Sequence, residues 1–299
     1  MTHSAIKTSA PFDPFTLRVA NGNEIEIGPK GLLVGIVNVT PDSFSDGGQY
    51  LDQKKAVEHA FSMIEAGAAI VDIGGESTRP GADAVSAEVE QARILPVLQS
   101  LAGKCKALIS VDTWRSETAR VALDAGADII NDIWALQKDE MLGAVVAQHK
   151  CGVIAMHNGR DRNRDRNVIA DQFSYFSRTL DLIDRHGIER DRVVLDPGFG
   201  FAKDPEENVE LLARFEELHA LGFPLLAGTS RKRFIGHYTG KDADNRDIGT
   251  AATAVVARMK GAALFRVHDV ASNRDALAIA DAVISAGTGL ENVDLETAS

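Results

Sequence analysis

Polar side chains follow a series of short apolar segments, each near the carboxyl end of its segment. The acids and amides are Asn38, Asp72, Glu76, Asp112, Asn131 and Asp196, and the nitrogen-bearing groups are His157, Lys232, Arg266 and His268, with Ser230 close to Lys232. Helix capping accounts for one or two residues of this kind, such as Thr113 or Asp132, but not for a polar group behind every segment. The pattern predicts a ligand site assembled from the ends of several strands.

Four of these residues suit a heterocyclic ligand that is rich in N–H donors. A 2-amino-4-oxo pyrimidine ring presents adjacent N–H groups to a carboxylate, and its carbonyl and ring nitrogen accept from an amide or an ammonium. Asp112, Asn131, Asp196 and Lys232 supply that complement. Buried carboxylates without a partner are costly, so such a site would reject a head that lacks the donors. We therefore expect a pterin-like head.

The segments that position these residues alternate between strand-like and helix-like patterns. The strand-like runs span 32–39, 69–75, 107–113, 128–133, 152–157, 192–198, 224–230 and 263–269, and helical segments include 53–66, 86–101 and 205–220. Runs that are apolar throughout are typical of parallel strands buried on both faces. Eight βα repeats favour an α/β fold of the (βα)8 TIM-barrel type, with an open doubly wound sheet as the alternative.

The ends of the chain and of its helices carry further signals. Residues 17–28 predict a β-hairpin that turns at Asn21-Gly22 and covers the barrel bottom. Gly67, Gly126 and Gly261 are expected to end helices in a positive-φ conformation. No linker-like stretch divides residues 17–286, so we expect flexible tails over 1–14 and 288–299 around a single domain over 15–287, with the barrel over 32–287.

The composition limits the class of protein. Hydrophobic residues make up 44% of the 299 residues, and no apolar run approaches the roughly 20 residues of a membrane span. The first residues lack the basic and apolar regions of a secretion signal, which predicts a cytoplasmic protein without membrane contact. A net charge of -11 argues against nucleic-acid binding but allows a local cationic pocket. Cys105 and Cys151 are expected to be reduced thiols without a metal-binding role.

A metal-dependent hydrolase is the first alternative function, since many barrels hold metals at the ends of their strands. The first strand lacks a His-x-His pair, and only His157 and His268 lie at strand ends, which disfavours this alternative. Arg231, Lys232 and Arg266 instead gather after the seventh and eighth strands, the usual phosphate site of this fold. The pattern indicates a ligand with a flat polar head and an anionic tail.

Eight motifs, in chain order, resemble those of the bacterial dihydropteroate synthases. They are GIVNVTPDSFSDGG (35–48), DIGGESTRPGA (72–82), SVDT (110–113), NDI (131–133), MH (156–157), LDPGFGFAK (195–203), SRKRFIG (230–236) and RVHDV (266–270). The resemblance covers about residues 30–275. It implies a transferase of folate biosynthesis, in which 4-aminobenzoate displaces diphosphate from (7,8-dihydropterin-6-yl)methyl diphosphate to give 7,8-dihydropteroate.

The resemblance also implies roles for individual residues. Asn38 matches a Mg²⁺-contacting asparagine, and the pterin-diphosphate site is matched by Thr78, Asp112, Asn131, Asp196, Lys232, Arg266, Val267 and His268. The last three of these would receive the diphosphate, and Asp112, Lys232 and Arg266 are the candidate catalytic residues. Mg²⁺ and cationic side chains would stabilise the charge on the departing diphosphate, so the protein needs no nucleophile of its own. A homodimer and inhibition by sulfonamides are further implications.

The second substrate is flat and has few polar groups, so we expect it under loops that exclude water. Loops 41–48 and 76–82 have the required composition, and the expected 4-aminobenzoate pocket consists of Phe44, Thr78, Arg79, Pro80, Ser230 and Lys232. Asn38 on rigid strand would serve the diphosphate, while Phe44 would serve the second substrate.

Two enzymatic or binding alternatives remain within the same fold. One is a pterin-binding methyltransferase domain, and the other is a non-catalytic pterin-binding paralogue. Residues 158–167 depart from the usual family composition and are interpreted as a solvated charged loop. Arg233 is given no role beyond local positive potential.

Overall fold

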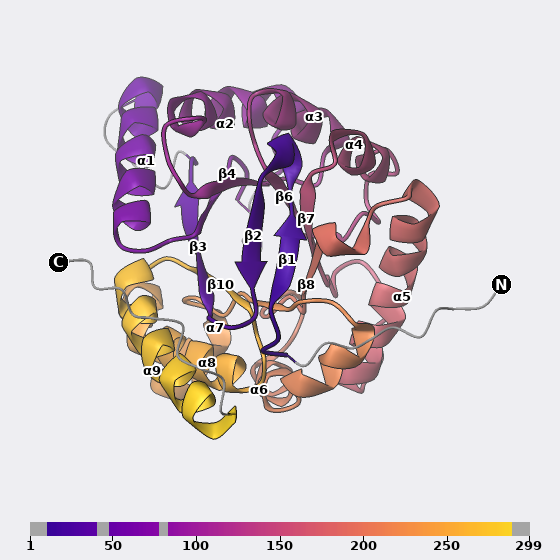
Figure 1. Cartoon of the computed structure of the whole chain (residues 1–299), viewed down its shortest axis with the longest axis vertical. Coiled ribbons are helices and arrows are strands. Elements are labelled where there is room, and N and C mark those ends of the chain that lie inside the picture. Colours follow the sequence, from indigo (N-terminus) through magenta and orange to yellow (C-terminus); the bar gives the residue numbers. More distant parts are fainter. Residues whose placement is uncertain (1–10, 41–47, 78–82, 289–299) are drawn as a thin grey trace.

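The computed structural model describes residues 11–40, 48–77 and 83–288. Its main sheet contains the parallel strands β3 (Leu32–Asn38), β4 (Ile70–Gly74), β5 (Leu108–Asp112), β6 (Ile129–Asp132), β7 (Gly152–Met156), β8 (Val193–Asp196), β9 (Leu226–Ala227) and β10 (Leu264–Val267). Their spatial order is β8-β7-β6-β5-β4-β3-β10-β9, and a parallel bridge between Leu195 and Leu225 joins the two edges. The predicted (βα)8 barrel is confirmed, and the open doubly wound alternative is wrong (Figure 1).

Helices cover the outside of this barrel. They are α1 (Gly48–Glu65), α2 (Ala87–Leu101), α3 (Ser116–Asp124), α4 (Leu142–His149), α5 (Val168–His186), α6 (Pro205–Ala213), α7 (Arg233–Thr239), α8 (Asp247–Met259) and α9 (Val270–Thr288). Asp204 and Glu207 form a capping box at the start of α6, which fixes where the segment from β8 turns into a helix. Gly67, Gly126 and Gly261 all have positive φ, as predicted for helix ends.

Two predicted elements differ from their predicted length. The predicted helix over 205–220 ends at Ala213 and continues as a 3₁₀ turn over Phe215–Leu221, because Arg214 leaves helical geometry at φ -111°. The predicted strand over 224–230 pairs over only Leu226–Ala227. Its next residue, Gly228, passes so close to Asp196 that an added Cβ would lie 3.4 Å from Oδ2. The chain leaves the sheet there to form a wall of the pocket described below.

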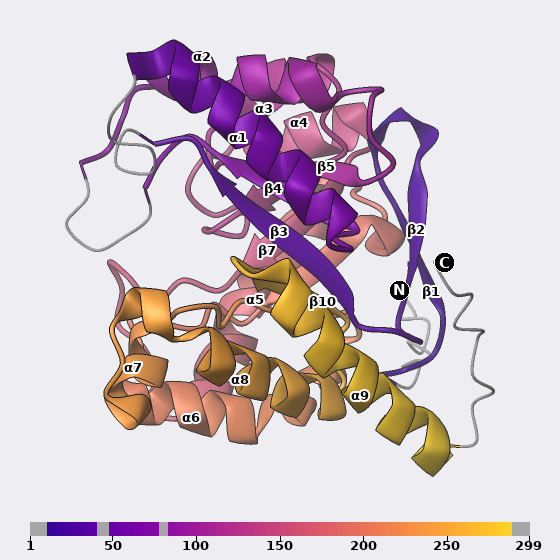
Figure 2. The same ribbon diagram turned by 90° about the vertical axis from the view of Figure 1, so that its left-hand side faces the viewer.

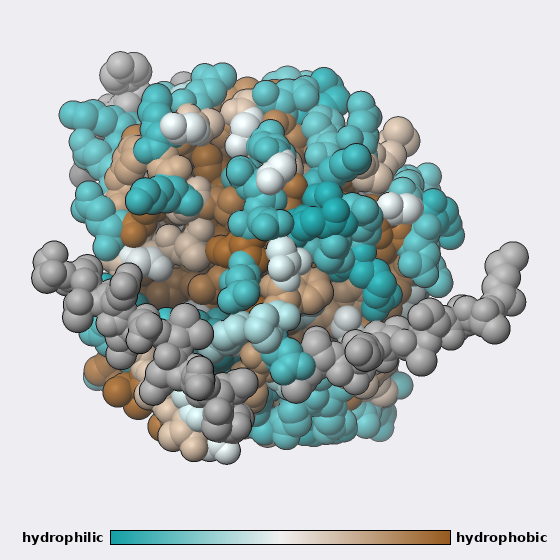
Figure 3. All heavy atoms as spheres, viewed as in Figure 1, coloured by the Kyte–Doolittle hydropathy of each residue, from teal (hydrophilic) through white to brown (hydrophobic). Residues whose placement is uncertain are grey.

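The predicted hairpin covers the amino end of the barrel. Strands β1 (Phe15–Arg18) and β2 (Glu24–Ile27) pair antiparallel, and Asn21 and Gly22 both have positive φ, as a type I′ turn requires. Leu17 and Ile27 are buried against the first residues of the barrel strands. Figures 1 and 2 show the hairpin across one end of the barrel, and Figure 3 shows hydrophobic side chains gathered around it. The carboxyl ends of the strands therefore open at the opposite end.

The barrel interior changes from apolar to polar along each strand. In β4, Ile70 points inward and packs with the hairpin, whereas Val71 points outward into the layer between strands and helices. Two residues after Ile70, Asp72 occupies the same inward face and is fully buried. An acid in this layer needs partners, and these lie in the site described next. Within the described residues, no helix is long and apolar enough to cross a membrane.

Candidate active site

Strand register brings four strand ends into one row. Asn38 is level with Gly74, Gly74 with Asp112, and Asp112 with Asn131. A Cβ built on Gly74 would lie 3.6 Å from the Asp112 Cβ and 3.8 Å from Asn38 Oδ1. The glycine therefore leaves the space between Asn38 and Asp112 open, and both predicted residues face that space.

One pocket contains most of the predicted pterin-binding side chains. It is lined by the polar residues Asp112, Asn131, Asp196, Lys232 and Arg266, the apolar residues Ile133, Met156, Phe199 and Phe201, and the glycines Gly198 and Gly228. Six different strands or their following loops supply these residues. Apolar walls with a few convergent polar groups are typical of sites for flat heterocycles.

A buried ionic network lies directly beneath this pocket. Arg266 donates from Nε to Asp72 Oδ2 at 2.6 Å and from Nη2 to Asp112 Oδ2 at 2.8 Å. Asp72 also accepts from Asn131 Nδ2 at 2.9 Å and from the Ser110 hydroxyl at 2.6 Å. Asp72 thus holds both Arg266 and Asn131 in place. Sequence analysis placed Asp72 among the polar strand ends but gave it no role.

Burial and charge move several pKa values in the pocket toward neutrality. Burial raises the pKa of Asp112 to about 7, against the opposing pull of Arg266 and with a contribution from Asp72. Burial also raises the pKa of Asp196, whose Oδ1 accepts the Gly198 backbone N–H at 2.7 Å. Burial and the nearby Arg266 lower the pKa of Lys232 to about 8. Such groups change charge readily when a ligand excludes or replaces water.

Residues 158–167, which follow β7, were predicted to form a solvated charged loop. That prediction is wrong for the first half of the segment, which makes contacts inside the protein. Asn158 is fully buried and donates to the Ile133 backbone oxygen at 3.1 Å. It positions Arg160, whose guanidinium lies 4.8 Å from the centre of the Phe201 ring in the pocket wall. Lys232 Nζ lies 4.5 Å from the centre of the same ring. Sequence analysis missed Arg160 because only the folded structure brings it to Phe201.

The residues predicted to receive the diphosphate differ in what they can offer. Val267 has its side chain buried in the core, so only its main chain is available to a ligand. Ser230 Oγ accepts the backbone N–H of His268 at 3.1 Å and lies 2.9 Å from His268 Nδ1. The hydroxyl proton is available to Nδ1, and a neutral ring that accepts it carries its own proton on Nε2. Burial and Arg266 lower the pKa of His268 to about 3, so this ring is neutral without a ligand.

Four residues of the predicted 4-aminobenzoate pocket, Phe44, Thr78, Arg79 and Pro80, lie outside the described residues. The two ends of the second loop are nevertheless defined. Arg115 donates to Glu76 at 2.7 Å on one side and to the Val85 backbone oxygen at 2.6 Å on the other. The ends of the segment 76–85 are therefore held together by one side chain from the loop after β5.

The described residues contain no cluster of three or more His, Cys, Asp or Glu side chains that could hold a metal ion. Asn38 offers a single amide oxygen beside Asp112. Mg²⁺ accepts amide oxygens but commonly keeps several waters and takes other ligands from substrate phosphates. These residues fit a metal that arrives with a phosphorylated ligand, and they do not form a site that would hold Mg²⁺ by itself.

Comparisons with known proteins identify the family. The family model described as pterin binding enzyme matches residues 34–268. The dihydropteroate synthase of Bacillus subtilis is 42% identical over 258 residues, which cover 86% of this chain and 90% of the relative. The Xanthomonas albilineans dihydropteroate synthase with 4-aminobenzoic acid superposes with a TM-score of 0.85 and 41% identity over 90% of this chain and 99% of that one. The Yersinia pestis enzyme with a sulfonamide drug has a TM-score of 0.84 and 38% identity over 91% and 100%.

Proposed function

We propose that this chain, which belongs to the pterin-binding enzymes and among them to the dihydropteroate synthases, binds a pterin head among Asp112, Asn131, Asp196 and Lys232. Family membership gives the activity: the chain is a transferase of folate biosynthesis that joins 4-aminobenzoate to (7,8-dihydropterin-6-yl)methyl diphosphate and releases diphosphate and 7,8-dihydropteroate. The observation that carries the residue roles is that one pocket holds all four side chains together with Arg266.

The pocket complements the donors and acceptors of the pterin ring. Asp112 and Asp196 offer carboxylate oxygens to the N–H groups of the ring. Asn131 donates its Nδ2 to Asp72, so its Oδ1 is the end that faces the ligand. Lys232 supplies a donor for a ring acceptor, and Phe201 supplies an apolar wall. A head without these donors would leave the remaining carboxylate oxygens of Asp112 and Asp196 without a donor in the pocket, which disfavours its binding.

Arg266 is placed to serve the diphosphate. It uses Nε and Nη2 for Asp72 and Asp112, which leaves Nη1 for an incoming anion. His268 would add a neutral N–H donor from Nε2, since Ser230 occupies Nδ1. A preorganised guanidinium in a buried pocket stabilises charge more strongly than it would in water. These groups favour departure of the diphosphate with the electron pair of the C–O bond.

The metal proposed for this reaction is Mg²⁺, with Asn38 as its protein contact. When bound, Mg²⁺ neutralises part of the charge on the leaving diphosphate. Asn38 Oδ1 would hold the ion at the mouth of the pocket, next to Asp112. The amine nitrogen of 4-aminobenzoate forms the new bond to the exocyclic methylene as the C–O bond to the diphosphate breaks, and the extra proton on this nitrogen is released to water. The Asp112 carboxylate lies beside the head and would stabilise positive charge that develops on the pterin ring.

We assign the second substrate to the side of the pocket formed by Phe201 and Lys232. The ring of Phe201 lies in the pocket wall and can pack against a flat benzoate ring, and two cations lie near that ring. Phe44, Thr78, Arg79, Pro80 and Ser230 remain the predicted partners. A sulfonamide drug is bound to the Yersinia pestis relative, and we propose that sulfonamides compete with 4-aminobenzoate in this chain as well.

Exposed apolar side chains on α8 and α9 support a homodimer. Ile248 is 89% exposed, Ile279 68% and Val283 53%, and Met259 of α8 is also exposed. Large apolar side chains gathered on two adjacent helices are typical of a surface that another chain covers. We propose that a second copy of this chain covers them, and we expect the enzyme in the cytoplasm, where its folate-pathway substrates are made.

One assay tests the function. Diphosphate release should require (7,8-dihydropterin-6-yl)methyl diphosphate, 4-aminobenzoate and Mg²⁺ together. A pterin-binding methyltransferase domain or a non-catalytic paralogue would release none. The variant Asp196→Asn should lose most of the affinity for the pterin substrate while the protein stays folded. Full activity of Asp196→Asn would refute the assignment of the head to this pocket.

A further inference from the structure

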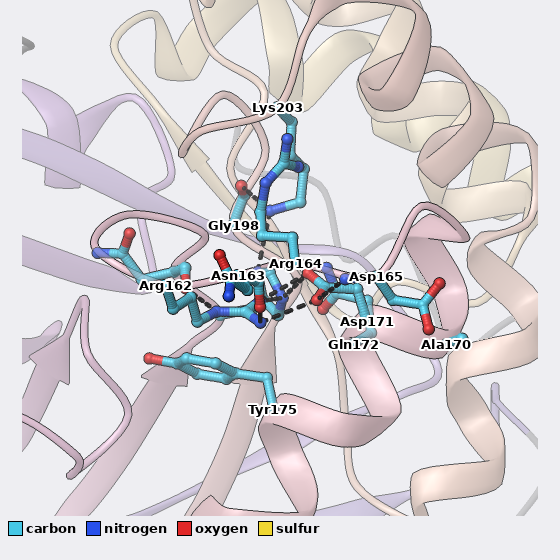
Figure 4. Close-up of polar contacts among 12 residues, drawn as sticks. Arg162, Asn163, Arg164, Asp165, Ala170, Asp171, Gln172, Tyr175, Gly198 and Lys203 are labelled. Atoms are coloured by element: carbon cyan, nitrogen blue, oxygen red, sulfur yellow. Dashed lines mark hydrogen bonds and ion pairs between the residues drawn. The ribbon is translucent and has the colours of Figure 1, made fainter.

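A cluster of buried and partly buried polar groups, most of them charged, lies directly behind the pocket wall. It consists of His157, Arg162, Asp171 and Lys203, hereafter the charged cluster. Arg162 donates to Asp171 Oδ1 at 2.8 Å and to Oδ2 at 2.6 Å, and His157 Nε2 lies 3.0 Å from Asp171 Oδ2. Lys203 Nζ lies 3.0 Å from His157 Nδ1. Figure 4 shows Arg162 pointing toward Asp171, with Tyr175 on one side and Lys203 on the other.

Burial and neighbouring charges set the charge states of the cluster. Burial lowers the pKa of His157 to about 3, so its ring is neutral and has one N–H group. Its Nδ1 lies 3.0 Å from Lys203 Nζ, and its Nε2 lies 3.0 Å from Asp171 Oδ2 and 2.8 Å from Arg162 Nη2. Hydrogen bonds from His157 and Arg162 outweigh burial and lower the pKa of Asp171. The cluster therefore combines one carboxylate with two cations, and Lys203 carries the charge nearest to the pocket.

Two further hydrogen bonds link Lys203 to the pocket. Lys203 Nζ donates to the Gly198 backbone oxygen at 2.8 Å, and the Gly198 N–H donates to Asp196 Oδ1 at 2.7 Å. Gly198 has φ +68°, and a Cβ there would lie 2.0 Å from the His157 backbone oxygen. No other residue fits at this position. Gly198 is thus held between the charged cluster and the carboxylate that faces the ligand.

Neutral side chains hold other backbone groups of the same segment, so holding Gly198 by a hydrogen bond does not by itself require a charged residue. Gln172 donates to the Pro197 backbone oxygen at 3.0 Å, and Asn208 accepts the Gly200 N–H at 2.7 Å. A buried ammonium costs far more than a buried amide. The charge at Lys203 therefore calls for an electrostatic reason. Burial lowers the pKa of Lys203, and Asp196 is the nearby charge that opposes this effect most; burial raises the pKa of Asp196, and Lys203 is one of the cations that oppose it.

We propose that Lys203 is a positioning residue for the pterin head: it holds the carbonyl of Gly198, the residue whose N–H orients Asp196, and its charge helps to keep the Asp196 carboxylate ionised. The inference rests on the proposed binding of the head by Asp196. Besides Lys203, the charged groups that act on Asp196 are Lys232 and Arg266. Those that act on Lys203 are Asp196, Asp171, Arg164 and Arg162. Burial lowers the pKa of Lys203 to about 7, so its charge is present in the acidic range where Asp196 protonates.

The test measures the dissociation constant of 6-hydroxymethyl-7,8-dihydropterin, the head without diphosphate, by calorimetry between pH 5 and 8. Lys203→Met removes the hydrogen bond and the charge, whereas Lys203→Gln keeps a donor and removes the charge. Lys260→Met is the matched control, because Lys260 pairs with Glu216 on the outer surface. Asp196→Asn tests the proposed head site independently.

Lys203→Met should weaken head binding about tenfold, the effect of a hydrogen bond to a charged group, and Lys203→Gln should weaken it less. In both variants the loss of affinity on acidification should begin at higher pH than in the wild type, since Asp196 loses a stabilising cation. The Michaelis constant for 4-aminobenzoate should stay within about twofold. If Asp196→Asn abolishes binding but both Lys203 variants keep the wild-type affinity and pH dependence, the inference is wrong. If Asp196→Asn binds normally, the proposed head site itself fails.

Discussion

Asp72 lies below the pocket, yet replacing it should change how Asp112 titrates. The variant Asp72→Asn keeps the shape, and its amide can still accept from Arg266 and Asn131 while its NH2 group faces the Ser110 hydroxyl. Only the charge is lost. Asp72 raises the pKa of Asp112 and Arg266 lowers it. The variant therefore removes the repulsion between the two carboxylates, and the positive charge of Arg266 then acts on Asp112 alone. Both effects lower the pKa of Asp112.

The size of this shift follows from the geometry. Two unit charges about 4 Å apart interact by about 4 kcal/mol at an effective dielectric constant of about 20. Arg266 contacts both carboxylates at 2.6 and 2.8 Å and offsets most of their repulsion. A remainder of about 1.4 kcal/mol corresponds to one pKa unit. The pKa of Asp112, about 7 in the wild type, should therefore fall by about one unit, and the free energy of unfolding should fall by about 2 kcal/mol from the weakened ion pair.

The assay is kcat/KM for the pterin substrate as a function of pH, at saturating 4-aminobenzoate and Mg²⁺. The head needs an ionised Asp112, so kcat/KM should fall below about pH 7 in the wild type. This acid limb should shift downward in Asp72→Asn and be absent in Asp112→Asn. Titration of the substrate is common to all variants and cancels in the comparison. Asp128→Asn, a buried acid at the hairpin end, is the charge-matched control. An acid limb that stays in place or rises in Asp72→Asn would refute the reasoning.

Three further changes test other parts of the site. Asn38→Ala should raise the Mg²⁺ concentration needed for half-maximal activity about tenfold without weakening binding of the head alone, and an unchanged Mg²⁺ requirement would remove Asn38 from the metal site. Arg160→Met should move the alkaline limb of kcat/KM above its wild-type position near pH 8, because Arg160 contributes to the lowered pKa of Lys232. Ile248→Asp should shift the enzyme toward monomers in light scattering, whereas Met141→Asp, an exposed apolar residue after β6, should not.

The sequence predicted the barrel well because each strand carries its own local signal. An apolar run of β-branched residues is visible within a few positions, and eight such runs followed by helical periods leave few architectures. The short pairing of β9 was not predictable in this way. Leu226 and Ala227 have the pattern of any other buried strand, and nothing in the following residues signals that pairing stops there and that Gly228 lines the pocket instead.

The positions of the ligand-facing residues were also readable, but their partners were not. Strand ends converge by topology, so Asp112, Asn131 and Asp196 were expected to meet. The role of Asp72 depends on Asn131, 59 positions away, and on Arg266, 194 positions away. These partners are too far apart in the sequence for a local pattern to reveal the contacts. The same holds for Lys203 and His157, which belong to different motifs 46 residues apart.

The charge balance around the pocket explains why the two parts of the substrate need different help. Asp72, Asp112 and Asp196 lie among Arg266, Lys232 and Lys203, so carboxylates and cations offset one another before any ligand binds. A neutral pterin head adds hydrogen bonds to this arrangement without adding charge. A diphosphate adds negative charge for which the balanced interior has little surplus to offer. We propose that the additional positive charge enters with the ligand as Mg²⁺, for which the amide oxygen of Asn38 beside Asp112 would be a suitable contact.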